Sequence, residues 1–423
     1  MSSISLSNKT MGLKSLNAST MQSMALKAFL RSFSSIKHGQ LIVNFSDETF
    51  KFGEAKPNED LKAIVNVNDI SAFQQMFING VVGAGESYMQ GLWHSPDLVA
   101  VIRVVSKNLS VTESFNAKQS PFRKLSLKLL RFIDRNSLKG SRKNIAAHYD
   151  LGNDFFSLFL DPTMMYSSAV YPHPSATLYE ASTYKLDLIC KKLQLKSTDH
   201  LIEIGTGWGG MAIHAAKHYG CNVTTTTISK EQYDYAKAEV EAAGLADKIT
   251  LLFDDYRELT GQYDKLVSIE MIEAVGHEYY ESYFSSCSHL LKQDGLALIQ
   301  AITISDQRFE KAKQEVDFIQ RYIFPGGCLP SNAVIASNVS QYTDMQIVDL
   351  QDITQDYAQT LKDWREAFFN NINSVKAMGF DDAFIAMWDY YLCYCEGGFR
   401  ERIIHTAQIL LAKPQARHVN PAK

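Results

Sequence analysis

Cysteine is scarce in this sequence, and its potential metal ligands are not clustered. The chain has 423 residues, of which 6 are cysteine and 11 are histidine. No two cysteines form a C-x-x-C pair, and no histidines stand beside them at ligand spacing. This pattern argues against a zinc site and against a disulfide framework. We therefore expect no metal, and thiols that stay reduced in a cytoplasm.

Apolar runs long enough to cross a bilayer are also missing. No segment approaches the ~20 apolar residues that a spanning helix requires. The N-terminal stretch MSSISLSNKTMGLKSLNAST lacks the apolar core of a secretory signal. Residues 1–25 are rich in Ser and Asn and contain no acidic residue, which predicts a mobile tail. The protein is expected to be soluble or peripheral to a membrane.

The sequence has no large excess of either charge. The formal net charge is -4, and 46% of the residues are hydrophobic and 21% charged, as in ordinary globular proteins. This balance gives no reason to expect nucleic acid as a partner. A chain of 423 residues exceeds the usual size of one domain, so we expect two.

Positive charge is concentrated in one segment, which we expect to be a linker. Residues 121–144 carry eight Lys and Arg residues against one acid, Asp134, with Leu, Phe and Ile between them. On an amphipathic helix these residues would place apolar side chains at a lipid boundary and cations at the headgroups. The alternative is a solvated helix that packs its leucines on the protein itself. Both interpretations stay open.

The rest of the pattern predicts two α/β domains of different size. Residues 26–120 mix short strands with helical stretches and predict a small domain. Over residues 145–423 strands alternate with helices, which predicts a doubly wound parallel sheet. Helical segments after Ile302 predict an insertion on the substrate side. The expected strands are 200–204, 222–227, 248–253, 265–269, 296–302 and 406–412.

The segment LIEIGTGWGG, Leu201 to Gly210, carries the strongest functional signal. An apolar strand runs into a glycine loop and then into a helix, an arrangement that makes a nucleoside pocket. Gly205, Gly207 and Gly210 fit the G-x-G-x-x-G spacing of dinucleotide-binding proteins. The loop alone is therefore compatible with a nicotinamide cofactor or with S-adenosylmethionine.

The next strands favour S-adenosylmethionine. A dinucleotide site usually has an acid at the end of its second strand for the ribose hydroxyls, but CNVTTTTIS, from Cys221, ends without one. Hydroxyl groups and Gln232 stand there instead. Asp254 and Asp255 follow the third strand, where a carboxylate can accept a hydrogen bond from the adenine amino group. A nicotinamide enzyme is therefore disfavoured.

Five further motifs resemble the cyclopropane-fatty-acyl-phospholipid synthase family. They are AAHYDLGNDFFSLFLDPTMMYSSAVY, TISKEQ, DDYREL, EMIEAVG and RYIFPGGCLPS, in this order along the chain. The resemblance implies a Rossmann-like class I methyltransferase core and an N-terminal lipid-associated domain. It also implies a homodimer that works in the cytoplasm, at the inner face of the cytoplasmic membrane, and methylates unsaturated acyl chains of phospholipids.

The same resemblance assigns the residues that bind the methyl donor. The MMYSS motif supplies two of them, the glycine loop three, the second strand and following helix two, and the third strand two. They are Tyr166, Ser167, Gly205, Thr206, Gly207, Thr227, Gln232, Asp254 and Asp255.

A base site is implied in the same way, with departures from the family. Glu273 matches the active-site glutamate, beside which the family holds a bicarbonate ion that removes a proton. The positions that hold this ion are Ser168, Gln300, Ile302 and Tyr357 in this chain. Ser168 replaces a cysteine that contributes mainly backbone, whereas Gln300 replaces a histidine, and Ala274 replaces another. An amide can donate to an anion but cannot relay a proton at neutral pH.

Aromatic side chains can support the carbocation that forms when an alkene is methylated. Tyr149, Tyr171 and Phe324 offer π faces for it, although filling of the core is the commoner role of such residues. Cys395 aligns with a cysteine proposed as a nucleophile in the family, but the chemistry needs none, and a buried structural thiol is the alternative. Glu270 can act electrostatically, cap a helix or face solvent.

The expected function is transfer of a methyl group from S-adenosylmethionine to the double bond of an unsaturated phospholipid acyl chain, giving a cyclopropane. The altered base site leaves a second outcome open, C-methylation without ring closure, which gives a methyl-branched or methylene chain. A third possibility is a non-catalytic lipid-binding or nucleoside-binding homologue.

Overall fold

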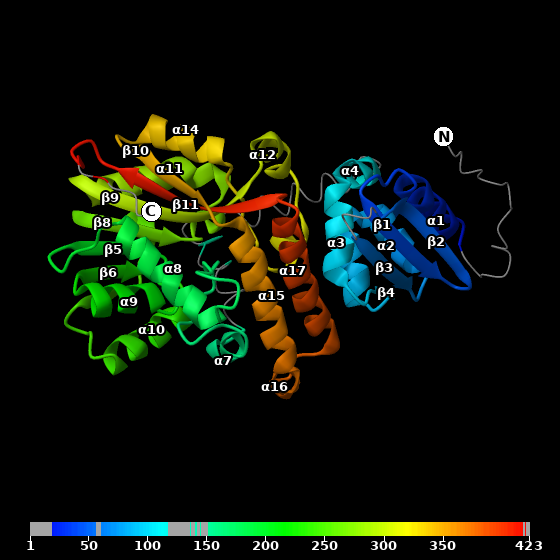
Figure 1. Cartoon of the computed structure of the whole chain (residues 1–423), viewed down its shortest axis with the longest axis horizontal. Coiled ribbons are helices and arrows are strands. Elements are labelled where there is room, and N and C mark those ends of the chain that lie inside the picture. The colour runs from blue at the N-terminus through cyan, green and yellow to red at the C-terminus, as the bar shows by residue number, and fades with distance from the viewer. Residues whose placement is uncertain are drawn as a thin grey trace. The chain divides into compact units, whose positions relative to one another are not determined.

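The chain folds into two compact units, which are described separately. The structure is a computed structural model that describes residues 19–55, 61–116, 151–417 and 419, with Asn136, Gly140, Ser141 and Asn144. The units are Met1–Lys124 and Leu125–Lys423 (Figure 1). The division falls inside the segment 121–144, whose Lys and Arg residues all lie outside the described residues.

The smaller unit is a four-stranded sheet with helices. Its strand order is β2-β1-β3-β4, and β1 pairs with β3 in parallel and with β2 antiparallel. The strands are β1 (Gly39–Phe45), β2 (Glu48–Glu54), β3 (Lys62–Val67) and β4 (Trp93–His94). The helices are α1 (Thr20–Phe33), α2 (Ser71–Met89), α3 (Leu98–Lys107) and α4 (Leu109–Asn116). The predicted small α/β domain is therefore present.

Helix α1 begins inside the segment predicted to be a tail. Ser19 accepts from the backbone of Gln22, and the Gln22 side chain accepts from the Ser19 backbone, which is a capping box. Ala25 and Leu26 are then buried in the core. The tail expected over residues 1–25 is thus wrong for residues 20–25, because this box starts the helix there. Residues 1–18 lie outside the described residues.

The larger unit is built on a seven-stranded sheet in the order β10-β11-β9-β8-β5-β6-β7. Strands β7, β6, β5, β8 and β9 are parallel neighbours. The strands are β5 (His200–Ile204), β6 (Asn222–Thr226), β7 (Ile249–Leu252), β8 (Tyr263–Ile269), β9 (Leu291–Ile304), β10 (Gln346–Asp352) and β11 (Ile404–Ala412). The predicted fold class, a Rossmann-like α/β core with a smaller N-terminal α/β domain, is confirmed.

Two features of this sheet depart from the prediction. The sheet is not wholly parallel, because β11 pairs antiparallel with both β9 and β10. Ile404 lies opposite Ile304, so β11 starts at the edge where β9 ends. This direction follows from a short connection, since helix α17 (Asp382–Arg400) ends three residues before β11 on that side. Strand β10 was not predicted, because its burial does not alternate cleanly.

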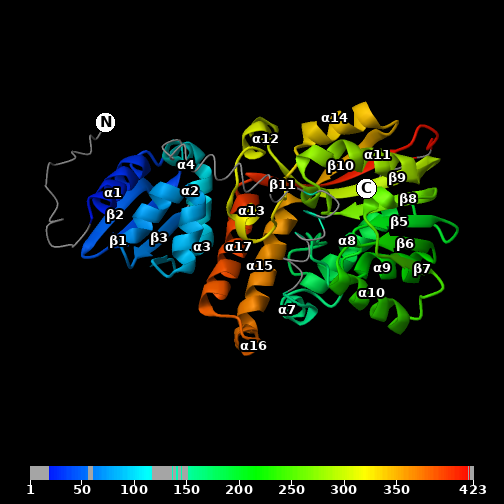
Figure 2. The same cartoon turned by 180° about the vertical axis from the view of Figure 1, so that it is seen from behind.

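Alternate residues of the central strands pack into two separate hydrophobic cores, one on each face of the sheet, because successive side chains of a strand point to opposite faces. Ile202 and Leu266 pack with α11 (Tyr280–Leu290) and α14 (Asn332–Tyr342). Leu201 and Val267 pack on the other face, with α8 (Leu178–Lys192), α9 (Gly210–Tyr219) and α10 (Lys230–Ala242). Figures 1 and 2 show these two helical layers on opposite faces of the sheet.

Helices after β9 form the predicted insertion, with an aromatic interior. Phe155 contacts Phe159, Phe368 and Trp388, with ring centroids 4.9–6.2 Å apart. The helices after β9 are α12 (Asp306–Ala312), α13 (Phe318–Tyr322), α15 (Thr354–Asn370), α16 (Ile372–Ala377) and α17. Helix α7 (Asn153–Ser157), which precedes the sheet in the chain, supplies Phe155 to this interior. Within the residues that the structure describes, no helix combines the length and apolar character needed to cross a membrane.

Candidate active site

The glycine loop after β5 has three residues in the left-handed region. Gly205, Gly207 and Gly209 have φ of 100°, 52° and 94°, which residues with a Cβ rarely adopt. A Cβ added at Gly207 would meet no atom within 4 Å, so this side of the loop is open for a ligand. At Gly210 the same atom would lie 2.5 Å from the carbonyl oxygen of Thr163. Gly207 therefore suits ligand approach, whereas Gly210 permits close packing.

The polar residues predicted at the ribose lie together. Thr227 donates to the Gln232 side chain over 2.9 Å, and both are buried at the end of β6 and the start of α10. Ser229 caps α10 and so fixes the position of Gln232. Thr206 bonds Thr225 hydroxyl to hydroxyl at 2.7 Å. The loop and the second strand thus form one hydrogen-bonded edge.

Asp254 and Asp255 have different environments. The Asp255 carboxylate is buried and accepts two hydrogen bonds of 2.7 Å from the Arg257 guanidinium. Arg257 also donates to the Asn136 carbonyl and to Ser141, so the end of the expected linker packs on this unit. The Asp254 side chain is exposed. Of the two predicted adenine contacts, Asp254 offers the carboxylate that no arginine occupies.

A buried lysine contacts one of the residues predicted to bind the methyl donor. Lys185, on α8, donates to Ser167 over 2.8 Å, and both side chains are buried. Burial lowers the pKa of Lys185 to about 8, and the carboxylates of Glu270, Asp161 and Glu203 partly oppose this shift. Sequence analysis missed Lys185, although it stands among the buried residues of an amphipathic helix, where a lysine is unusual.

Aromatic rings line the region around Tyr166. Its hydroxyl lies 2.9 Å from that of Tyr391, and its ring centroid lies 5.2 Å from Trp364 and 6.4 Å from Phe324. The predicted Phe324 therefore joins Tyr166. Trp364 and Tyr391 were not predicted. They belong to α15 and α17, which the sequence marked only as cap helices.

Tyr171, another of the predicted aromatic residues, is bonded to α15. Tyr171 donates its hydroxyl to Asp363 over 2.6 Å, and its backbone N–H donates to Asp356, so it is tied to α15. Burial and the Asp363 carboxylate raise the pKa of the Tyr171 hydroxyl. Tyr149 lies outside the described residues.

Three of the residues predicted to surround Glu273 instead hold Glu270, the residue that follows β8. The Ser168 backbone N–H and the Gln300 amide donate to Glu270 Oε1 over 2.9 and 2.8 Å. The Tyr357 hydroxyl donates to Oε2 over 2.7 Å. Ile302 is different, because its backbone N–H donates to Glu273 Oε1. The predicted group therefore divides between two carboxylates three residues apart.

The donors to Glu270 are themselves fixed. Gln300 accepts from Gln408 over 3.1 Å and donates also to the Ser168 carbonyl, so its amide has a set orientation. Ser168 uses its hydroxyl on the Ala169 carbonyl. Of Ser168, only the backbone N–H therefore donates to Glu270.

Glu270 has an unusual backbone for its side chain. Its φ is 50°, in the left-handed region, where a residue with a Cβ is destabilised by about 1–2 kcal/mol. The Glu270 N–H donates to the Gln300 carbonyl over 2.8 Å, so the strained residue is held against β9. Such strain is typical of functional positions.

The two carboxyl groups have unequal partners, and this separates their proton affinities. Glu273 Oε2 is buried without a hydrogen-bond partner. Burial and the Glu270 charge raise the pKa of Glu273 to about 8. Burial also raises the pKa of Glu270, but its bonds from Gln300, Tyr357 and Ser168 and the charge of Lys185 oppose that shift. The hydrogen bonds and the Lys185 charge therefore favour the ionised form of Glu270, whereas burial without a partner favours the protonated form of Glu273.

Cys395 lies in α17 and does not have the environment of a nucleophile. Burial raises the pKa of its thiol, with a further contribution from the Asp317 charge. A reactive cysteine needs the opposite, a lowered pKa near a cation or a base. Among the described residues, moreover, no group of three or more His, Cys, Asp or Glu is placed to hold a metal ion.

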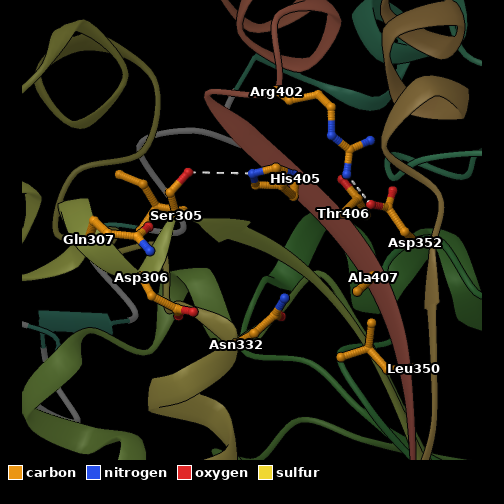
Figure 3. A pocket seen from close by; sticks show the side chains of 11 residues that line it. Ser305, Asp306, Gln307, Asn332, Leu350, Asp352, Arg402, His405, Thr406 and Ala407 are labelled. Carbon is orange, nitrogen blue, oxygen red and sulfur yellow. Dashed lines mark hydrogen bonds and ion pairs between the residues drawn. The ribbon is translucent and has the colours of Figure 1, made fainter.

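A surface hollow of about 270 Å³ lies elsewhere, at the start of β11 (Figure 3). In its wall Arg402 forms an ion pair with Asp352, and the Ser305 hydroxyl lies 3.5 Å from His405 Nε2. None of the residues predicted for donor, base or substrate lines it. The hollow is therefore not the predicted site.

Comparison with known proteins identifies relatives of this arrangement. The model of the mycolic acid cyclopropane synthetase family matches residues 136–409. Tuberculostearic acid methyltransferase UfaA1 of Mycobacterium tuberculosis is 38% identical over 342 residues, 79% of this chain and 79% of that protein. Cyclopropane-fatty-acyl-phospholipid synthase of Escherichia coli K12 is 35% identical over 358 residues, 84% of this chain and 89% of that protein.

A solved structure is similar over the larger unit. Mycolic acid cyclopropane synthase CmaA1, complexed with SAH and CTAB, is 31% identical, and the match covers 64% of this chain and 98% of that one, with a TM-score of 0.60. SAH is the product left when S-adenosylmethionine gives up its methyl group.

Alanine at two loop glycines should separate binding from stability. Gly210→Ala places a Cβ against the Thr163 carbonyl and should lower the free energy of unfolding by about 1–3 kcal/mol. Gly207→Ala should cost about 1 kcal/mol of backbone strain and weaken SAH binding at least tenfold, because its Cβ enters the open side. Thermal denaturation and calorimetric titration with SAH measure both. Unchanged SAH affinity in Gly207→Ala would contradict the assignment.

The raised pKa of Glu273 should make stability depend on pH. Its pKa of about 8 in the folded state exceeds the ordinary 4.5, so the stabilisation is complete below pH 4.5 and is lost as the pH rises to 8. Glu273→Gln cannot ionise and should lose less stability between pH 5 and 8. Glu203, with a pKa also raised to about 8 by burial, and Glu270, whose pKa is raised as well, should contribute to the remaining slope. Denaturation at several pH values tests this, with the exposed Glu281→Gln as control.

Proposed function

We propose that this chain, which belongs to the mycolic acid cyclopropane synthetase family and is an S-adenosylmethionine-dependent fatty acid C-methyltransferase, acts on a double bond of an unsaturated phospholipid acyl chain and forms a cyclopropane. The observation that carries this proposal is the pair of carboxyl groups, Glu270 and Glu273, beside an aromatic cluster. The cluster contains Tyr166, Phe324 and Trp364.

This site matches the needs of an alkene as a nucleophile. The methyl group of a sulfonium is electrophilic, but an isolated double bond is weakly nucleophilic, so both must be held at near-attack distance away from water. Ser168 and Gln300 are fully buried and Tyr357 nearly so, which keeps this region dry. Aromatic faces and a carboxylate stabilise the cation that develops. The site therefore favours carbon methylation over methylation of a heteroatom.

The proposed reaction balances in two steps. The sulfonium C–S bond breaks, sulfur keeps its electron pair, and the π electrons of the alkene form the new C–C bond. A carbocation remains on the second alkene carbon. Loss of a proton from the new methyl group to a base then lets the C–H electron pair close the ring. The protein must supply a base that stays unprotonated in a dry site.

A second product is a specific alternative, because the base site is altered. Gln300 and Ala274 stand where the family motif has histidines. If the cation undergoes a hydride shift before it loses a proton, the product is a methylene chain or a methyl-branched chain that keeps a double bond. The name of UfaA1, a tuberculostearic acid methyltransferase, is compatible with this alternative.

The lipid is proposed to be reached from a membrane surface. The basic segment 121–144 supplies the charge and the apolar residues for contact with anionic headgroups. We propose a peripheral protein at the inner face of the cytoplasmic membrane, with a homodimer as its assembly, as the family resemblance implies.

The purified protein should transfer label from methyl-labelled S-adenosylmethionine to unsaturated phospholipid vesicles. Mass spectrometry should find that each modified acyl chain gains about 14 Da, the mass of one CH₂ group. Ring-opening derivatives should then distinguish a cyclopropane from a methylene chain. Vesicles with saturated chains are the control. SAH binding without labelled acyl chains, with lipids of the native host also tested, would instead support a non-catalytic binding protein.

Cys395 should be dispensable. Cys395→Ala removes a buried thiol whose pKa is raised, and the methyl transfer needs no sulfur nucleophile. We expect kcat within about threefold of the unchanged protein, and a lower melting temperature from the lost packing. A loss of activity by a hundredfold, with SAH binding intact, would show that the thiol takes part in the chemistry.

A further inference from the structure

We infer that the Glu270 carboxylate takes the place of the bicarbonate ion and is the proton acceptor of this enzyme. The inference rests on the proposed function and names the base of that reaction. It predicts an enzyme that needs no bicarbonate, although the family resemblance implies that ion.

The hydrogen-bond donors expected for the ion are already in use. The resemblance assigns the ion to the Ser168 backbone, the residue at 300, the Ile302 backbone and the Tyr357 hydroxyl. In the structure three of these four donate to the carboxylate of Glu270, over 2.7–2.9 Å. The fourth, Ile302, donates to Glu273. A planar, anionic CO₂ group is thus already in the place that bicarbonate would need, and the residues do not fit a separate ion.

Gln300 stands where the family motif has a histidine. A base fixed to the chain must be held in one orientation, but it does not have to be captured from solution. Gln300 does this without a titrating group, because its amide donates to Glu270 and its carbonyl is held by Gln408. The substitution that removes a proton relay therefore goes together with a carboxylate that accepts the proton directly.

The backbone of Glu270 also supports this role. The residue has a φ of 50°, which glycine adopts freely and glutamate does not. The backbone conformation at this position disfavours Glu, yet its side chain makes three hydrogen bonds inside the predicted base site. Strain kept at a residue with this many site contacts points to a functional role.

The arrangement also shows which oxygen receives the proton. Oε1 accepts two hydrogen bonds, from Ser168 and Gln300, and Oε2 accepts one, from Tyr357. Oε2 therefore keeps a lone pair for the proton that leaves the new methyl group. The C–H electron pair closes the ring, Glu270 becomes a neutral acid, and its proton passes to water after the product has left.

Removal of bicarbonate is the direct test. Labelled methyl transfer to unsaturated phospholipid vesicles is measured in CO₂-free buffer, and again with added sodium bicarbonate. The inference expects the two rates to agree within twofold. A rate that falls tenfold or more without bicarbonate, and returns when the salt is added, would overturn it.

Two substitutions test the residue itself. Glu270→Gln keeps the shape but cannot accept the proton, and should lower kcat by about 10²–10⁴-fold with SAH affinity unchanged. Glu270→Gly suits the φ of this position, so it should fold and should lose activity as well. In Glu270→Gly the space is vacated, and sodium formate or bicarbonate should restore at least a tenth of the lost rate. Glu281→Gln, at an exposed site, is the matched control.

The outcomes separate this inference from the proposed function. If the unchanged protein labels no lipid, the proposed function fails. If it labels lipid and Glu270→Gln keeps its rate within threefold, the proposed function stands and the inference is wrong. If Glu270→Gly is inactive and neither anion restores it, while SAH still binds, Glu270 positions other groups and is not the base. A rise of kcat with pH that disappears in Glu270→Gln would support the inference independently.

Discussion

The organising interaction of the larger unit is the set of hydrogen bonds that converge on the Glu270 carboxylate. Ser168 belongs to the irregular segment before α8, Gln300 to β9 and Tyr357 to the first turn of α15. The Glu270 side chain therefore joins the segment before α8, the sheet and helix α15 of the cap. Each of these donors is buried, so loss of the carboxylate would leave the Ser168 N–H, the Tyr357 hydroxyl and one N–H of Gln300 without this acceptor. This dependence explains why a strained backbone is tolerated at residue 270.

The sheet determines where these groups meet. Parallel strands bring their carboxyl ends to one edge, and Gly205, Glu270 and Ile302 all lie at or near that edge, after β5, after β8 and near the end of β9. The antiparallel β11 then returns from the cap at the same edge, so that α15 and α17 are anchored over the site. A methyl donor in the glycine loop and a chain held under the cap would meet beside the two carboxyl groups. The mixed sheet is thus part of how the cap is placed.

The sequence was informative where the chemistry depends on local pattern, and less so where it depends on contacts between distant segments. The glycine loop, the strands β5 to β9 and the Thr227–Gln232 pair follow from motifs within a few residues. The assignment of Ser168, Gln300 and Tyr357 to one group was also possible, through the family motifs. Which glutamate they hold was not, because Glu270 and Glu273 stand three residues apart and only the folded chain shows which carboxylate the three donors reach. Lys185 and Trp364 were missed because a buried lysine and a buried tryptophan look like ordinary helix residues in a sequence.

Two carboxyl groups so close together cannot both be charged without a cost, and the structure resolves this through unequal solvation. Glu270 has three donors from other segments and the charge of Lys185 nearby, whereas Glu273 has only backbone donors and an oxygen without a partner. These surroundings favour the proton on Glu273 and the negative charge on Glu270. A base that is tethered loses no translational entropy on each turnover, unlike an ion that must bind from solution. The left-handed backbone at Glu270 destabilises the fold locally. The same residue keeps the proton acceptor in place whenever the carbocation forms.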